Sequence, residues 1–592
     1  MQCTCISYEA LSYCWGDDTQ IYSMTLNGHT FEISNALGQG LYYLRLPDAV
    51  RILWVDAICI NQNDIDDKGK QVSQMAQVYR HAQRVVAWLG VPRWNSSLAL
   101  DFAETLYASF PENWRRGTEG ELANGDPRRR LGDEHSVPVI NQFMHKDHAR
   151  EWLALLNLFG KRLYWTRAWI FQEILLAKRL LFVCGPRSST WGVVQAAMEI
   201  VRTSARQATD LINNSHPIPD QDTLYPINQQ NPYFFDFQVT ELMLGVVEGR
   251  HYMKNYFNEE SLSNTTERWL ELINIRGCKY PHDRIYGIFG LISPSITSQM
   301  LPPRYDWPVQ EVFKQFARAY ILGTNSLNIL CFSHHSDTQW DLPSWVLDWR
   351  RDVRLATVHD IAGVVGTRSQ RAWHATALAS HLPTFSSESS RISVRGIRYG
   401  IVKHVRLEHE PNILPQVTKM KFTIKDTHCD EVYPTYEREW WDLKDYAAEM
   451  LGDAPPDSKM LGQERASTLL RVLLARRDPS RLTAISQERQ TWCTKPNNLD
   501  WALMSMLSVS KCRTAIETDG LDVALAPMWT KPGDILCQFV GCTAAVILEP
   551  LNGGVYKFIG GCYVLGKMGD VTIKILEEAM MMPEKLETFT LV

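Results

Sequence analysis

Residues 51–89 read RILWVDAICINQNDIDDKGKQVSQMAQVYRHAQRVVAWL, and this stretch decides the fold class. Its first nine residues, 51–59, are nearly all apolar, which predicts a strand that is covered on both faces. From about Asp67 to Ala82 the apolar residues recur at helical spacing, which predicts an amphipathic helix. Residues 85–89 are a second apolar run. A strand, a helix and a strand in this order indicate a parallel sheet with crossover helices.

The same alternation continues on both sides of this stretch. Upstream, we expect a strand at residues 10–15, a hairpin around Asn27-Gly28 and a helix that Asn35 caps. Downstream, we expect helices at about 150–159 and 167–178, the second capped by Thr166, and a strand at 180–184. Residues 1–185 are therefore predicted to form one α/β domain with helices on both faces of a mainly parallel sheet.

The rest of the chain has a weaker pattern. Residues 186–375 are predicted to be mostly helical, with a polar linker at 205–235 and an amphipathic helix at 307–322. Residues 376–592 are predicted to be a mixed α+β region with a helix near 440–475. Four apolar runs near its end predict terminal strands: Ile535–Val540, Ala544–Leu548, Val555–Ile559 and Cys562–Leu565.

Composition narrows the functional classes. The 592 residues carry a net charge of −5, so no overall basic field favours nucleic acid. No apolar run approaches the ~20 residues of a membrane helix, and no signal peptide follows Met1. The 13 cysteines include no CxxC pair and no cluster with zinc spacing. We expect a cytoplasmic protein without a bound metal, nucleic acid or membrane.

Three blocks of residues resemble one known family in the family's order. They are 8–17 (YEALSYCWGD), 53–64 (LWVDAICINQND) and 164–174 (YWTRAWIFQEI). Together they resemble the HET (heterokaryon incompatibility) domain of fungal proteins. Residues 283–291 (DRIYGIFGL) and 342–349 (LPSWVLDW) are similar to segments that often follow such domains. The resemblance implies a role in non-self recognition and programmed cell death.

HET domains in turn resemble TIR domains, which have a flavodoxin-like fold. Here Trp169 and Glu173 have the Trp-x-x-x-Glu spacing of the TIR helix that carries the catalytic glutamate. In that pattern a cysteine often follows the tryptophan, whereas this chain has Ile170. The resemblance implies a TIR-like domain over residues 1–185, with Glu173 as the catalytic residue of a possible NAD glycohydrolase. NAD would then be the substrate, and no cofactor is implied.

The chemistry of these two side chains fits such a reaction. Residues four apart share one helix face, which places Trp169 beside Glu173. A carboxylate can stabilise the oxocarbenium-like state that forms when the nicotinamide–ribose bond breaks. An aromatic ring can stack on a flat ligand ring and exclude water.

Sheet topology suggests the rest of the site, because ligands of open α/β sheets bind outside the carboxyl ends of the strands. The first predicted strand ends near Ser12, and Asp56 lies within the second. Candidate substrate-binding residues, besides Trp169, are Ser12, Trp15, Gly16, Asp17, Asp56, Asn61 and Gln62.

Each candidate also has a structural interpretation. Glu173 is equally consistent with a surface residue, or with an ion pair to Arg167 or Lys178. The tryptophans are also consistent with residues of the hydrophobic core. Asp56 is also consistent with a carboxylate that is paired inside the protein, because a buried carboxylate without a partner is costly. Residues 61–64 (NQND) suit a polar turn that caps a helix.

Two functions from different classes follow. In the first, the domain associates with itself and hydrolyses NAD, and cell death results. In the second, it is a non-enzymatic adaptor that acts through self-association and binds an unidentified protein partner. The region beyond about residue 200 is expected to hold the domain inactive or to sense a partner, so its deletion would increase toxicity.

Overall fold

The computed structural model describes residues 7–16, 21–112, 115, 133–215, 245–247, 249–250, 266–267, 269–270, 273, 276–332, 342–350, 368–386, 390–405, 513–520, 522–564 and 567–592. They form two compact units. The first comprises residues 1–297 and 301–309, and the second comprises 298–300 and 310–592. None of the helices in these described ranges has the length and hydropathy of a membrane span.

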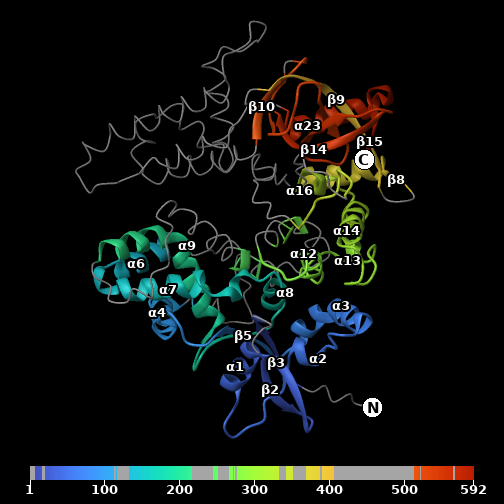
Figure 1. The fold of residues 1–592 in the computed structure, drawn as a ribbon. Coiled ribbons are helices and arrows are strands. Elements are labelled where there is room, and N and C mark those ends of the chain that lie inside the picture. Colours follow the sequence, from blue (N-terminus) through green and yellow to red (C-terminus); the bar gives the residue numbers. More distant parts are fainter. Residues whose placement is uncertain are drawn as a thin grey trace, which may run out of the picture. The chain divides into compact units, whose positions relative to one another are not determined.

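The first unit is built on a five-stranded sheet (Figure 1). Its order is β4-β1-β5-β6-β7, where the first four strands are parallel and β7 is antiparallel to β6. The strands are β1 Glu9–Tyr13, β4 Leu53–Trp54, β5 Arg84–Gly90, β6 Leu180–Cys184 and β7 Arg187–Thr190. The predicted α/β fold with a parallel sheet is therefore confirmed.

Helices cover both faces of this sheet, so the side chains of β1 are buried on both sides. Leu11 and Tyr13 point to one face, where they join a buried cluster with Leu37 of α1 Asn35–Leu44. Ser12 points to the opposite face and is fully buried there. Because successive strand residues face opposite sides, a polar residue in an apolar strand needs a partner on its own side.

Helix α3 Ile65–His81 confirms the predicted amphipathic helix. Asp64 is its N-cap and accepts hydrogen bonds from the backbone N–H groups of Asp66 and Asp67. This satisfies two of the donors that a helix start leaves without partners. The buried stripe of the helix is Gly69, Val72, Met75, Ala76 and Tyr79.

The remaining helices of the sheet region surround strands β5 to β7. Helices α4, α7 and α9 pack on one another, as their mutual contacts show. Trp165 of the short helix η2 and Trp191 at the start of α9 both stack on Phe182 of β6. The bounds are α4 Ser96–Ala108, α6 Asp133–Phe143, α7 Ala149–Gly160, η2 Leu163–Thr166, α8 Ile170–Leu175 and α9 Trp191–Asn214.

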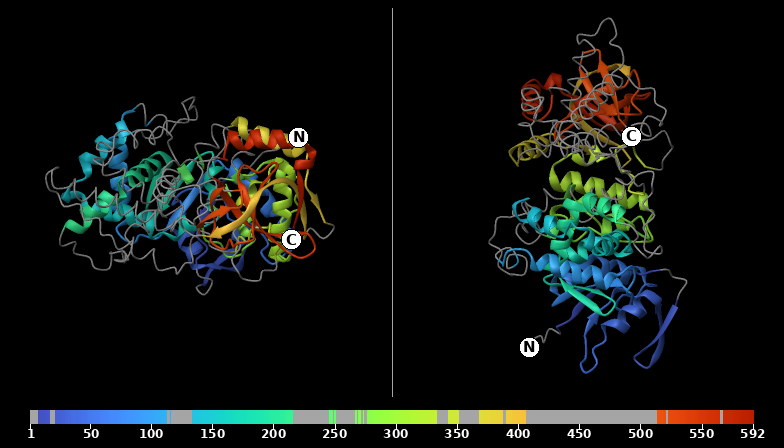
Figure 2. Two further views of the ribbon diagram at one scale, coloured as in Figure 1. Left: turned by 90° about the horizontal axis from the view of Figure 1, so that it is seen from above. Right: turned by 90° about the vertical axis from the view of Figure 1, so that its left-hand side faces the viewer.

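The predicted hairpin is confirmed as β2 Ile21–Leu26 and β3 His29–Ser34. It projects from the rest of the first unit in Figure 1 and in the right-hand view of Figure 2. Asn27 and Gly28 connect the strands with φ of 51° and 83°. Two consecutive left-handed residues match the right-handed twist of the strands, which is why Asn-Gly favours this turn.

Gly28→Ala is expected to lower the stability of the first unit by about 1 kcal/mol. Nothing lies within 4 Å of a Cβ at this position, so the cost comes from the left-handed backbone and not from a clash. Urea denaturation would measure it. Gly28→Asn is the control, because asparagine tolerates this conformation; equal losses for both variants would contradict the explanation.

Three predicted elements of the first unit are wrong in extent. The strand at 51–59 is only β4, because the chain turns after Val55 into the short helix α2 Asp56–Cys59, so Asp56 does not lie within a strand. The helix at 167–178 begins at Ile170. The polar segment 205–235 is helical as far as Asn214, because Ala205, Ala208 and Ile212 continue the buried side of α9.

The late start of α8 has a long-range cause. Arg167 is extended, with φ of −75° and ψ of 139°, and pairs with Gly277 in a parallel bridge. The Ala168 N–H donates to the Gly277 carbonyl at 2.9 Å. This pairing to a residue far along the chain holds Arg167 extended, and the Thr166 hydroxyl bonds the Leu163 carbonyl instead of capping a helix.

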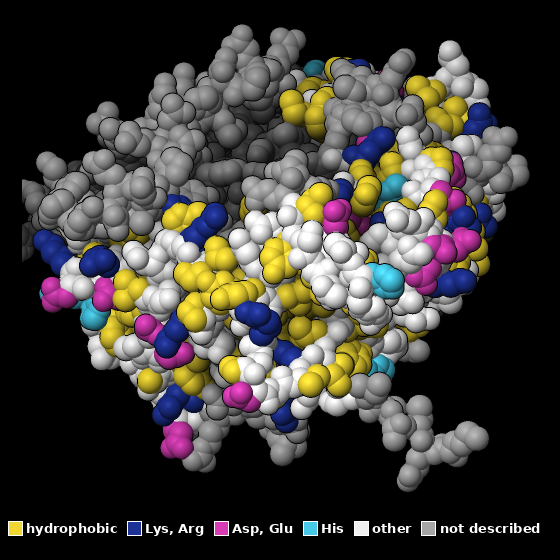
Figure 3. All heavy atoms as spheres, turned by 60° about the horizontal axis from the view of Figure 1, so that its bottom comes forward, with side chains coloured by type: hydrophobic (Ala, Val, Ile, Leu, Met, Phe, Trp, Pro, Cys, Tyr) yellow, Lys and Arg dark blue, Asp and Glu magenta, His cyan; other side chains and the backbone are white. Residues whose placement is uncertain are grey.

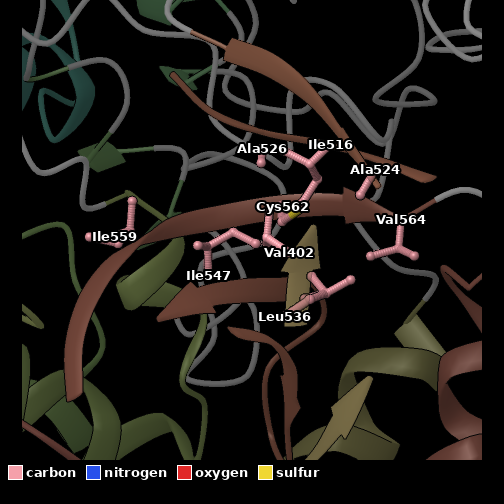
Figure 4. Close-up of a cluster of buried hydrophobic side chains, with 10 residues drawn as sticks. Val402, Ile516, Ala524, Ala526, Leu536, Ile547, Ile559, Cys562 and Val564 are labelled. Atoms are coloured by element: carbon pink, nitrogen blue, oxygen red, sulfur yellow. The ribbon is translucent and has the colours of Figure 1, made fainter. Parts of the chain in front are cut away.

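The second unit contains the predicted amphipathic helix as α14 Val309–Thr324 and an eight-stranded sheet. Its pairings run β9-β12-β13-β14-β11-β10 and back to β9, so six strands close into a ring. Apolar side chains from all six fill the interior (Figure 4). The strands are β8 Thr384–Phe385, β9 Ile392–Val405, β10 Arg513–Thr518, β11 Val523–Pro527, β12 Ile535–Phe539, β13 Ala545–Pro550, β14 Val555–Val564 and β15 Glu587–Leu591.

The predicted terminal strands are thereby confirmed, with the last two runs joined in one strand, β14. Two helices, α16 Arg368–Ala379 and α23 Asp570–Met581, contact each other in this unit. The expected helix near 440–475 lies outside the described residues. The three-part division at 185 and 375 stays a prediction.

Candidate functional site

The central contact of the candidate site joins β1 to α8. The Ser12 hydroxyl donates to Oε2 of Glu173 at 2.5 Å, and its oxygen lies 2.8 Å from the Tyr164 hydroxyl. Ser12 is fully buried, and Glu173 and Tyr164 are each 1% exposed. The sheet residue and the helix residue predicted for the site therefore meet, but they meet in the interior.

Two buried carboxylates share one cation in this interior. Asp56 is 8% exposed, and both it and Glu173 attract the guanidinium of Arg167, a residue that is half-buried as a whole. Nη1 of Arg167 also donates to the Tyr13 carbonyl at the end of β1. The Arg167 side chain, whose backbone pairs with Gly277, thus interacts with both acids and with the end of β1.

The pKa values of these groups follow from burial opposed by charge. Burial raises the pKa of Glu173 to about 7, although Arg167 and the Ser12 hydrogen bond act to lower it. Burial also raises the pKa of Asp56, against the effects of Arg167 and of the Trp15 hydrogen bond. For Arg167, burial lowers the pKa, but the two carboxylates outweigh it and hold the value above normal.

Asp56 is paired internally. Nε1 of Trp15 donates to its Oδ2 at 2.8 Å, and the Ala57 N–H donates to Oδ1 at 2.7 Å. The Tyr13 hydroxyl is a further hydrogen-bond partner. The Gln62 side chain donates to the Asp56 carbonyl at 3.2 Å. The loop after β1 and the turn after α2 are therefore tied together through this aspartate.

The other predicted loop residues lie further out. Asn61 is exposed, and its side chain accepts from the Asn63 N–H within its own turn, at 3.2 Å. Gly16 is exposed, with φ of 79°, and a Cβ there would lie 2.9 Å from the Cβ of Ala36. Asp17 lies outside the described residues.

Trp169 is half-buried, and its indole nitrogen hydrogen-bonds the carboxylate of Asp283. Asp283 is 4% exposed and also accepts from the Tyr305 hydroxyl at 2.7 Å. The Trp169 carbonyl accepts a helical hydrogen bond from the Glu173 N–H at 3.2 Å, so the two residues lie one turn apart. The indole N–H of Trp169 points to Asp283. Asp283 belongs to a later segment of the chain and not to the loop after β1.

Tyr164 and Asp283 were not predicted from the sequence as site residues, and Arg167 was predicted only as a partner for an ion pair. Tyr164 lies nine residues before Glu173, and the extended residue Arg167 separates their helices, so no helical spacing relates the two. Asp283 was visible only within the segment 283–291 that resembles regions after HET domains. Among the described ranges, no group of three or more His, Cys, Asp and Glu residues is arranged to hold a metal ion.

Residues 8–173 match the family model described as Heterokaryon incompatibility protein (HET). Ser12, Asp56, Tyr164, Arg167 and Glu173 all fall inside this span. The chain is also 24% identical over 378 residues to "Heterokaryon incompatibility protein 6, OR allele" of Neurospora crassa. That alignment covers 58% of this chain and 53% of the relative, so the chain spans about half of the relative's length.

No solved structure matches the chain. The predicted HET domain is thus supported by the family match and by the relative. Its likeness to TIR domains stays a prediction.

Proposed function

We propose, from the HET match over residues 8–173, that this chain acts in heterokaryon incompatibility, as a non-self recognition protein whose signal leads to cell death. The name of the Neurospora crassa relative supports the same role. Within that role the HET domain would be the signalling part, acting after self-association or contact with a protein partner.

Within this role we propose that the domain hydrolyses NAD and that Glu173 is its catalytic residue. The observation that carries the proposal is the hydrogen bond of 2.5 Å between Ser12 and Glu173, which joins the first strand to the acid-bearing helix. In the reaction the bond between nicotinamide and ribose breaks, and water adds to the ribose. The products are nicotinamide, ADP-ribose and a proton, and the ionised carboxylate would stabilise the cationic sugar.

The proposed reaction sets a requirement on the domain. Glu173 is 1% exposed and contacts Ser12 of β1, so a substrate reaches it only when α8 moves away from this strand. Self-association would supply the free energy for that opening, since a partner that binds the open state shifts the equilibrium toward it. Activity should then depend on protein concentration.

Glu173→Gln is expected to reduce nicotinamide release from NAD by about 10²–10³-fold, as loss of one electrostatic stabiliser does. The variant keeps the shape of the side chain and an acceptor for Ser12. The assay would use the concentrated full chain and measure nicotinamide over time. Lys178→Gln, which removes an exposed charge just beyond α8, is the control and should act like the wild type.

Equal trace release by wild type and Glu173→Gln would reject the enzymatic proposal and favour the adaptor. One observation supports that alternative: large apolar side chains lie open around α1 and the hairpin. Ile21 is 61% exposed, Tyr42 58% and Val50 90%. Figure 3, in which the lower side of Figure 1 comes forward, shows apolar side chains in open contact with solvent on this side. Such a surface suits association between copies.

Cell death on overexpression separates the two functions further. If the domain is an adaptor, Glu173→Gln still kills, and Tyr42→Asp with Val50→Asp does not. If it is an enzyme that needs association, both changes stop killing. The enzymatic proposal fails if Glu173→Gln kills as the wild type does.

A further inference from the structure

A segment beyond the HET match contacts both α8, which carries Glu173, and the neighbouring helix α3. Residues 276–297 and 301–309, here called the strap, belong to the same compact unit as the sheet. The strap contains α12 Asp283–Tyr286, which Figure 1 shows next to α8. The family match ends at residue 173, so the strap is outside it.

The strap holds α8 at both ends of its first turn. Before the helix, the Ala168 N–H donates to the Gly277 carbonyl at 2.9 Å. At its start, the indole of Trp169 bonds Asp283. Within it, Oε1 of Gln172 accepts from the Gly290 N–H at 2.8 Å. These contacts fix the residues on either side of the turn that leads to Glu173.

The strap also holds α3. The ammonium of Lys68 lies 4.3 Å from the ring centroid of Tyr305 and is attracted to Asp283. One residue further, a Cβ on Gly69 would lie 2.3 Å from the Pro303 carbonyl oxygen. Asp283 therefore receives Trp169 from α8, Tyr305 from the strap and the charge of Lys68 from α3.

Gly290 lies where the strap meets both helices. A Cβ at this position would be 2.2 Å from the Cβ of Ala76 in α3 and 2.8 Å from Oε1 of Gln172 in α8. Real Cβ atoms do not approach this closely, so even alanine forces the strap away from the helices or the helices apart. The backbone of Gly290 therefore packs directly against both helices and leaves no room for a side chain.

We propose that the strap completes the HET domain and that Asp283 and Gly290 are positioning residues, which hold α8 so that Glu173 meets Ser12. The inference depends on the proposed function only where cell death is measured. It also gives a physical reason for the truncation expectation: a chain cut near residue 200 loses the strap that holds α8 closed, so it should be more toxic than the full chain.

The test is hydrogen–deuterium exchange on the full chain, comparing wild type with Gly290→Ala and with Asp283→Asn. Exchange at residues 168–177 should accelerate about tenfold in Gly290→Ala, and less in Asp283→Asn, while β5 and the strands of the second unit keep their wild-type rates. Gly277→Ala is the matched control in the same segment. Its Cβ would find the Thr166 carbonyl at 3.5 Å, an ordinary contact, and exchange should not change.

The inference is overturned if both variants leave exchange at 168–177 at the wild-type rate, or if α8 and β5 accelerate equally in the milder variant, Asp283→Asn. If Gly290→Ala unfolds the whole sheet, Asp283→Asn decides. Variants that loosen α8 without increasing killing would support the inference and contradict the proposed opening step, so the two can fail separately.

Discussion

Arg167→Met is expected to lower the unfolding free energy of the first unit by about 3–5 kcal/mol near pH 8, the usual cost of leaving buried charges without their partner. Both Asp56 and Glu173 lose the cation that they share. The Tyr13 carbonyl loses the donor that it now has in Arg167. Urea denaturation, followed by exchange at β1 and β5, would assign the loss to this unit.

A second substitution tests the electrostatic explanation. Adding Glu173→Gln to Arg167→Met removes one of the two stranded carboxylates, so part of the lost stability should return. Acid should also help Arg167→Met, because protonation removes the stranded charges. A loss that is the same at pH 5 and pH 8, and unaffected by Glu173→Gln, would mean that packing and not charge explains the effect.

This charge arrangement connects the fold to the proposed chemistry. Two acids and one arginine leave an excess negative charge in the interior, and burial makes that charge costly. A proton on Glu173 relieves it in the closed domain. Opening α8 would hydrate the carboxylate and favour its ionised form, the form that can stabilise a cationic sugar. Closed and open states would then differ in the protonation of the residue proposed for catalysis.

Local patterns in the sequence predicted the elements that depend on local physics. The stripe of α3, the Asn27-Gly28 turn and β6 Leu180–Cys184 were all predicted from periodicity or turn chemistry. The strand at 51–59 was wrong because apolar content does not distinguish a strand from a short helix that starts at an acidic residue. The predicted extent of α8 was wrong because Gly277 fixes the backbone of Arg167. A pairing with a residue so far along the chain cannot be read from the neighbouring sequence.

For the candidate site, the sequence allowed the proximity of Ser12 and Glu173 to be predicted, but not their burial. Placing Ser12 and Glu173 near each other followed from sheet topology, since ligands and polar residues gather at one edge. Their burial did not follow, because it depends on Tyr164, which joins Ser12 across an irregular segment, and on the strap. Long-range packing against Asp283 and Gly290 likewise has no periodic signal in the sequence.

The pH dependence of stability is the second large effect. Glu173 has a folded-state pKa of about 7 against an ordinary value of 4.5, so between these pH values the folded chain binds the proton more than the unfolded chain does. Its contribution to stability is therefore fully present below pH 4.5 and is lost as the pH rises through 7, by on the order of 3 kcal/mol. Glu173→Gln should match the wild type near pH 4.5 and be more stable than it at pH 8.

The measurement is the difference between the urea stability curves of wild type and Glu173→Gln from pH 4.5 to 8. Burial raises the pKa of Asp534 to about 6, so this residue also contributes to the pH dependence of stability. Its contribution cancels in the difference, because both proteins contain it. Glu32→Gln on β3 is the matched control. Its carboxylate is exposed, so its difference curve should be flat. If Glu173→Gln is less stable than the wild type at pH 8, the carboxylate is ionised and well compensated in the folded domain, and the protonated closed state proposed above is wrong.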